Sequence, residues 1–112
     1  MADDALSPDD VFELLSDDCR RHALSILATH GESLTLADLA DEVAVRLHDA
    51  PLGELAAETV AEVYMSLYHH HVPKLAAEDV VAYDQERDLV SPDDNLDHCR
   101  EYLPSLGPGG EA

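Results

Sequence analysis

Histidines and cysteines are the residues of this chain whose types are best suited to holding a metal. Three histidines are consecutive, at positions 69–71, and two pairs lie elsewhere, Cys19 with His22 and His98 with Cys99. Imidazole and thiolate groups are common protein ligands of zinc. Because a helix turns by about 100° per residue, the three consecutive side chains diverge and cannot meet at one ion.

The two Cys/His pairs raise a second possibility, because Cys19 and His22 share one face of a helix at the spacing i, i+3. If that helix packs against the one that carries His98 and Cys99, the four side chains make a zinc site. The alternative, which we favour, is a pair of core thiols with surface imidazoles, so no metal and no cofactor are expected. Two cysteines in a cytoplasmic protein are also expected to stay reduced.

Two adjacent bases, Arg20 and Arg21, follow two acids, Asp17 and Asp18. Local ion pairs among these four residues are the interpretation that we favour, and contact with a phosphate group is the alternative. The sequence has no Gly-rich phosphate loop, nucleophile elbow or metal-hydrolase helix. We therefore expect a binding protein and not an enzyme.

The balance of charge is strongly acidic. Twenty-five acids face six bases, of which Lys74 is the single lysine, and the formal net charge is −19. High charge can indicate disorder, but 46% hydrophobic residues in helical periods favours a folded chain. Such a chain repels itself in dilute buffer, whereas in molar salt the screening length falls to ~3 Å. This composition resembles that of proteins from salt-loving archaea.

At 112 residues the chain has room for one domain and one core. We expect a disordered N-terminus over residues 1–6, the domain over residues 7–103 and a flexible tail over residues 104–112. No apolar run approaches the ~20 residues that span a bilayer, and the acidic N-terminus does not resemble a signal peptide. The expected location is the cytoplasm, with no membrane contact.

Capping signals divide the first part of the chain into helices. Ser7 followed by Pro8 predicts the start of a first short helix, Ser16 the start of a second, and Gly31 the end of that second helix. Thr35 predicts the start of a third helix, whose amphipathic stripe is the clearest in the sequence. The stripe consists of Leu36, Leu39, Ala40, Val43, Ala44 and Leu47. A fourth helix is predicted over residues 57–71, ended by Pro73.

The last part of the domain changes character. Two short apolar runs, at residues 80–83 and 89–90, flank a polar turn and predict a β-hairpin. The sequence Ser91-Pro92-Asp93-Asp94 then predicts a last helix, with Leu96, Cys99 and Leu103 on one face. The predicted fold class is mainly α with a small β-hairpin: a winged helix-turn-helix plus a C-terminal helix.

Several segments resemble one large, uncharacterised family of haloarchaeal winged-helix domains. The similar segments are Val11-Phe12-Glu13-Leu14-Leu15-Ser16 with Arg20-Arg21-His22-Ala23-Leu24, then Thr35-Leu36-Ala37-Asp38-Leu39-Ala40, Leu67-Tyr68-His69-His70-His71-Val72-Pro73-Lys74-Leu75 and Val80-Val81-Ala82-Tyr83-Asp84. Residues 71–75 are the most specific part of a likeness that covers residues 10–90. The resemblance implies a winged-helix fold and a role in transcription, without a known ligand. Asp79 stands where the family usually has a glycine, and aspartate tolerates the left-handed conformation required there.

If the domain binds double-stranded DNA, its fourth helix should enter the major groove. With Tyr64, Tyr68, Val72 and Leu75 placed inward, the outward residues of the helix and the wing are the predicted DNA contacts. They are Met65, Ser66, His69, His70, Lys74 and Arg87. Serine and histidine hydrogen-bond to base edges or phosphates, while Lys74 and Arg87 would contact the backbone.

The first prediction is therefore a DNA-binding transcriptional regulator of a halophilic archaeon. The alternative is a winged helix that has become a protein-interaction module, because DNA binding normally needs several cations and this helix carries Lys74 alone. A homodimer through the terminal helices is also predicted, since two-fold DNA sites need two-fold proteins. The stripe of Leu96, Cys99 and Leu103 would supply that interface or pack against its own domain.

Overall fold

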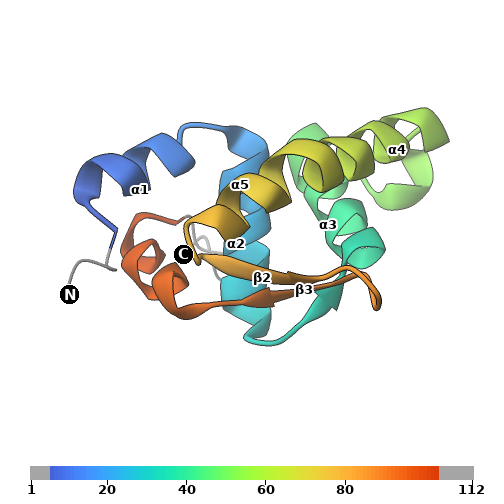
Figure 1. Cartoon of the computed structure of the whole chain (residues 1–112). Helices are drawn as coiled ribbons and strands as arrows, with labels where there is room; N and C mark the ends of the chain where they lie inside the picture. Colours follow the sequence, from blue (N-terminus) through green and yellow to red (C-terminus); the bar gives the residue numbers. More distant parts are fainter. Residues whose placement is uncertain (1–5, 104–112) are drawn as a thin grey trace.

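The computed structural model describes residues 6–103. We predicted disordered or flexible ends over residues 1–6 and 104–112. Residues 1–5 and 104–112 lie outside the described residues, whereas Leu6 is described and is partly buried against the core. The domain is mainly helical with a small three-stranded antiparallel sheet (Figure 1). Its elements in chain order are α1 (Pro8–Leu14), α2 (Asp18–His30), β1 (Leu34–Thr35), α3 (Leu36–His48), η2 (Leu52–Glu54), α4 (Ala57–Ser66), η3 (Leu67–His71), α5 (Val72–Ala77), β2 (Val81–Asp84), β3 (Leu89–Pro92), η4 (Asp94–His98) and η5 (Arg100–Tyr102).

Most of the predicted helix ends are confirmed by their hydrogen bonds. Ser7 and Asp10 form a capping box at the start of α1, and Gly31 ends α2 with a φ of 71°. Thr35 caps α3 through a hydrogen bond from the backbone N–H of Asp38. One start is displaced by a residue, because the side chain that caps α2 belongs to Asp17 and not to Ser16.

The predicted end of the fourth helix at Pro73 is wrong. Residues 57–77 form one continuous helical segment made of α4, η3 and α5, which we call the long helix. η3 is a π-helical turn, in which the backbone N–H of Val72 donates to the carbonyl of Leu67. Proline has no N–H and its ring crowds the preceding turn. The helix continues past Pro73 because the backbone hydrogen bond just before it already spans five residues instead of the usual four.

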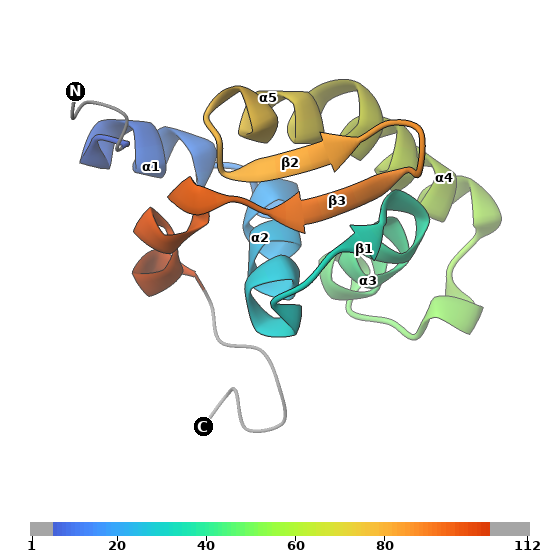
Figure 2. The same cartoon turned by 60° about the horizontal axis from the view of Figure 1, so that its bottom comes forward.

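The predicted hairpin is confirmed, and it belongs to a larger sheet than we predicted. β2 pairs with β3 in antiparallel register, with Tyr83 opposite Val90. Thr35 was predicted only as a helix cap, but it also lies in β1, which pairs with the other side of β3 and gives the strand order β1-β3-β2. Figure 2 shows the sheet in front of α2 and α3. Asp79, just before the hairpin, has a φ of 60°, in the left-handed region that we expected.

The predicted C-terminal α-helix is wrong. Ser91 and Pro92, which resemble the start of a helix, instead extend β3 and pair with β2. The chain then continues in the two 3-10 segments η4 and η5, whose turns close with i to i−3 bonds such as Cys99 N–H to the carbonyl of Leu96. The backbone N–H of Asn95 donates to the carbonyl of Asp79, which ties the start of this segment to the turn before β2.

The core lies between the helices and the sheet. The predicted stripe of α3 is buried as far as Ala44, and Leu47 is partly buried. The large side chains that are fully buried are Leu14, Leu24, Ile26, Leu27, Leu36, Leu39, Leu67, Leu75, Leu96, Val43, Val72 and Val80. Within residues 6–103, none of the helices combines the length and the apolar character needed to cross a membrane.

Candidate functional site

The outer face of the long helix faces solvent along much of its length. Met65 is 49% exposed, His69 and His70 are exposed, and Ser66 is partly exposed. These four residues, which we call the outer strip, were predicted to contact DNA together with Lys74, which lies farther along the same helix. The structure places all four on the solvent side, where donors and acceptors on a helix can reach a partner.

The inner face of the long helix differs in part from our prediction. Val72 and Leu75 are buried as predicted, but Tyr64 and Tyr68 are only partly buried. The remaining positions inside are Val63, Leu67 and His71. The π turn explains part of this difference, since it adds a residue between Leu67 and Val72 and brings both side chains to the core.

The cations near this surface are occupied by carboxylates. The ammonium group of Lys74 lies 3.3 Å from a carboxylate oxygen of Glu13, and the guanidinium of Arg87 lies 3.9 Å from Asp84. Glu58 and Glu62 are exposed in the first turns of the long helix. They lie on the same side of the helix as Ser66, because the three residues are spaced four apart. The surface therefore offers hydrogen-bonding groups and negative charge rather than free positive charge.

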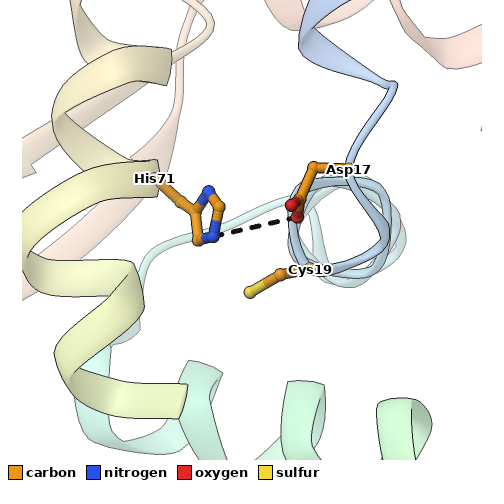
Figure 3. A group of neighbouring side chains, drawn as sticks. All are labelled: Asp17, Cys19 and His71. Carbon is orange, nitrogen blue, oxygen red and sulfur yellow. Dashed lines mark ion pairs between the residues drawn. The ribbon is translucent and has the colours of Figure 1, made fainter. Parts of the chain in front are cut away.

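Behind the outer strip, His71 turns inward and meets two residues from the start of α2. Ligand atoms of Asp17, Cys19 and His71 lie within 4.8 Å of one another (Figure 3). The ring atom Nε2 of His71 is 3.8 Å from Oδ1 of Asp17. Among residues 6–103, no other group of three or more potential metal ligands has its ligand atoms this close together. His22, His98 and Cys99, which we considered with Cys19 as a zinc site, are not members of it.

Arg20 joins this cluster, and its hydrogen bonds to backbone carbonyls and to His71 give it a role beyond the local ion pairs that we predicted. Its side chain is 5% exposed and donates from Nε to the carbonyl of Leu14 at 2.6 Å and from Nη2 to the carbonyl of Glu13 at 3.3 Å. Its Nη1 donates to Nδ1 of His71 at 3.2 Å. Arg20 thus satisfies the last carbonyls of α1 and holds the long helix. Arg21 does form the expected ion pair, with Asp18.

The contact with Arg20 decides whether the cluster suits a metal. A guanidinium has donors only, so Nδ1 of His71 must accept, which assigns the ring proton to Nε2. Nε2 is the atom that faces Asp17 and Cys19, and a protonated nitrogen cannot bind a metal. A metal-bound histidine normally donates from its other nitrogen to an acceptor, which is the reverse of this arrangement. We assign the cluster a structural role.

Burial and neighbouring groups together set the protonation of Asp17, Cys19 and His71. It raises the pKa of the Cys19 thiol to about 12, which keeps the sulfur a thiol at neutral pH. Burial also lowers the pKa of His71, with Asp17 opposing this shift and Arg20 adding to it. For Asp17, burial acts to raise the pKa, but the hydrogen bond from the backbone of Arg20 and the nearby His71 outweigh it, and the pKa is lowered.

The stripe that we predicted for a homodimer is not free. Leu96 and Cys99 are buried in their own domain, at 1% and 0% exposure, and Leu103 is partly buried against the same core. Phe12 and Tyr102 remain exposed nearby, with their rings edge to face and the centroids 5.3 Å apart. The homodimer stays a prediction.

Replacing Arg20 should destabilise the fold far more than replacing an exposed arginine. The variant Arg20→Gln leaves the buried carbonyl of Leu14 and Nδ1 of His71 without their charged donor, and we expect a loss of about 3 kcal/mol in the free energy of unfolding. The matched variant Arg87→Gln breaks only an exposed pair and should cost less than about 1 kcal/mol. Urea unfolding in molar KCl measures both, and equal losses would contradict the buried role of Arg20.

The fold should lose stability in mild acid. Because the pKa of His71 in the folded state lies below the value of about 6.5 in an unfolded chain, the unfolded chain takes up protons first. The stabilisation is complete above about pH 6.5 and decreases as the pH falls toward the folded-state pKa. Urea unfolding between pH 5 and 7 at constant KCl should show this slope.

The variant His71→Gln should flatten that slope, whereas His48→Gln, on the exposed end of α3, should retain it. A residual slope is expected from His22, because burial, Arg21 and Arg46 also lower its pKa. A His71→Gln variant with the full slope of the parent protein would rule out His71 as its source.

Comparison with known proteins gives one match. Residues 12–91 match the family of a domain of unknown function, DUF7344. No curated protein and no solved structure matched the chain. The matched segment begins within α1 and ends within β3, and it includes the Arg20–His71 contact and the long helix. The chain therefore belongs to the DUF7344 family, whose function is unknown.

Proposed function

We propose that this domain is a winged-helix DNA-binding domain of a transcriptional regulator that works in molar salt. The observation that carries the proposal is the exposed outer strip of the long helix beside the hairpin β2–β3. The order α2, β1, α3, long helix, β2, β3, with the strands arranged as β1-β3-β2, supports a winged helix-turn-helix. In that arrangement the long helix is the element that enters the major groove.

The chemistry of the outer strip fits recognition of base edges better than attraction to phosphates. Ser66, His69 and His70 have both donors and acceptors when the imidazoles are neutral, and Met65 offers an apolar contact to a thymine methyl group. Free cations, which supply most of the affinity of ordinary DNA-binding proteins, are scarce because Lys74 and Arg87 pair with acids. In molar salt, counterion release contributes little, so this lack costs a halophilic protein less affinity.

DNA binding is tested by selecting sites from a random duplex library in molar KCl and then measuring affinity over a KCl series. We expect enriched sites and an affinity that stays level or rises with salt. The variants His69→Ala and His70→Ala should each weaken binding by about tenfold or more, whereas His48→Ala, on α3, should bind like the parent. Failure to enrich any site, or a steep loss of affinity as KCl increases, would overturn the proposal.

A protein-interaction module is the second candidate, favoured by Glu58 and Glu62 on the solvent side of the long helix. These carboxylates would face the phosphates of a bound duplex, whereas a protein partner with basic groups would pair with them. This candidate predicts no DNA enrichment at any KCl concentration. It also predicts that a photocrosslinker placed at Met65 joins the domain to a protein, and that Glu62→Gln weakens the complex.

Adaptation to high salt is testable without knowing the ligand. The repulsion among the acids should be screened as the Debye length falls from ~10 Å at 0.1 M to ~3 Å at 1 M salt, so the thermal midpoint should rise most over this range. Sucrose strengthens burial without screening charge and should raise the midpoint less than KCl does. Circular dichroism melts compare the two, and a midpoint insensitive to KCl would contradict halophilic adaptation.

A further inference from the structure

The hairpin is joined to the long helix by the carboxylate of one turn residue, Asp88. The hydroxyl of Tyr64, on α4, donates to Oδ2 of Asp88 at 3.2 Å. The hydroxyl of Tyr83, on β2, donates to Oδ1 of the same carboxylate. One acceptor group therefore binds donors from the helix and from the strand at the same time, and the carboxylate is partly shielded from solvent.

The backbone of Asp88 makes a further connection. Its φ is 58°, in the left-handed region, and its carbonyl accepts a hydrogen bond of 2.8 Å from the N–H of Leu36. Leu36 is the first residue of α3, where a helix has N–H groups without partners of its own. Asp88 thus contacts the hairpin, the long helix and α3 together.

Aromatic packing surrounds this contact. Tyr68, one turn after Tyr64, stacks on it with centroids 6.4 Å apart, and meets the ring of Tyr83 edge to face at 6.2 Å. The side chain of Gln85, in the hairpin turn, donates to the hydroxyl of Tyr68 at 3.3 Å. Three of the four tyrosines of the chain therefore lie where the hairpin meets the long helix.

The donors in this network are neutral, which matters in concentrated salt. The nearby ion pair between Arg87 and Asp84 is exposed and loses strength when salt screens it. A hydrogen bond from a neutral phenol to a carboxylate is short in range and is screened much less. Burial raises the pKa of Tyr64 and Tyr83, and Asp88 raises it further, so both phenols stay protonated and remain donors.

We propose that Asp88 is a positioning residue, which fixes the β2–β3 hairpin against the long helix and so sets the shape of the surface that carries the outer strip. The first part of this proposal concerns the fold alone, whereas its consequence for ligand binding rests on the proposed function. Of the acids in the hairpin, Asp84 instead accepts from the backbone N–H groups of Glu86 and Arg87 within its own turn.

Asp88→Asn is the direct test, with Asp49→Asn as its matched control. Asparagine tolerates the left-handed backbone, so this substitution should keep the turn. It removes the negative charge and leaves one acceptor oxygen on the side chain. Asp49 has the same backbone conformation, with a φ of 51°, at the exposed end of α3, and no side-chain hydrogen bond joins it to residues 6–103. Amide hydrogen exchange at neutral pH in molar KCl should speed up about tenfold over β2 and β3 in Asp88→Asn only.

Tyrosine titration gives a second readout that a general loss of stability would not produce. The chain has no tryptophan, so the ultraviolet change at high pH reports its four tyrosines. In the parent protein Tyr64 and Tyr83 should ionise above the ordinary value of about 10, and Asp88→Asn should lower the pKa of both. Tyr83→Phe, which keeps the backbone, should remove one of the two late steps.

The outcomes separate this proposal from the proposed function. If the folded parent ionises all its tyrosines together, or if Asp88→Asn and Asp49→Asn exchange alike, Asp88 does not position the hairpin. If the exchange and the titration change as expected, Asp88 positions the hairpin whether or not DNA binds. Where the parent does select DNA sites, Asp88→Asn should bind them about tenfold more weakly with the same helical content.

Discussion

The placement of the long helix depends on the buried guanidinium of Arg20. This side chain ends α1 by donating to the carbonyls of Leu14 and Glu13, and it also donates to Nδ1 of His71. Because a buried charge is costly unless its donors are satisfied, the three acceptors hold one geometry between the first two helices and the long helix. In this geometry His71 is inside, and His69 and His70 are on the surface.

High negative charge imposes a second constraint on how the elements are joined. With twenty-five acids and six bases, few inter-element contacts can be ion pairs, and those at the surface, such as Lys74 with Glu13, are weakened by salt. The contacts between elements that are best shielded from solvent are hydrogen bonds and not ion pairs. They use a guanidinium donating to carbonyls and an imidazole, or neutral phenols donating to Asp88. The outer strip likewise has no lysine or arginine: it consists of Met65, Ser66, His69 and His70.

Local signals predicted much of the fold because they act over a few residues. The caps at Ser7, Thr35 and Gly31, the apolar stripe of α3 and the two apolar runs of the hairpin all depend on neighbours in sequence, and all are confirmed. The same approach failed at two prolines, which usually mark a helix boundary. Pro73 lies in a continuing helix, and Pro92, after Ser91, lies in a strand. The exposure of Met65, His69 and His70 also followed from helical spacing, and their role as DNA contacts stays a prediction.

By itself, then, the sequence determined the first three helices, the start of the long helix, the hairpin, the acidic composition and the exposure of Met65, His69 and His70, since periodicity, capping and composition encode these locally. Tertiary structure alone decided the third strand, the burial of Arg20 and the gathering of Asp17, Cys19 and His71. It also decided that Asp88 joins Tyr64 to Tyr83. Each of these brings together residues far apart along the chain or depends on the packing of several elements. Such contacts form only after the core has placed their elements, and a pattern of neighbouring residues contains no information about that placement.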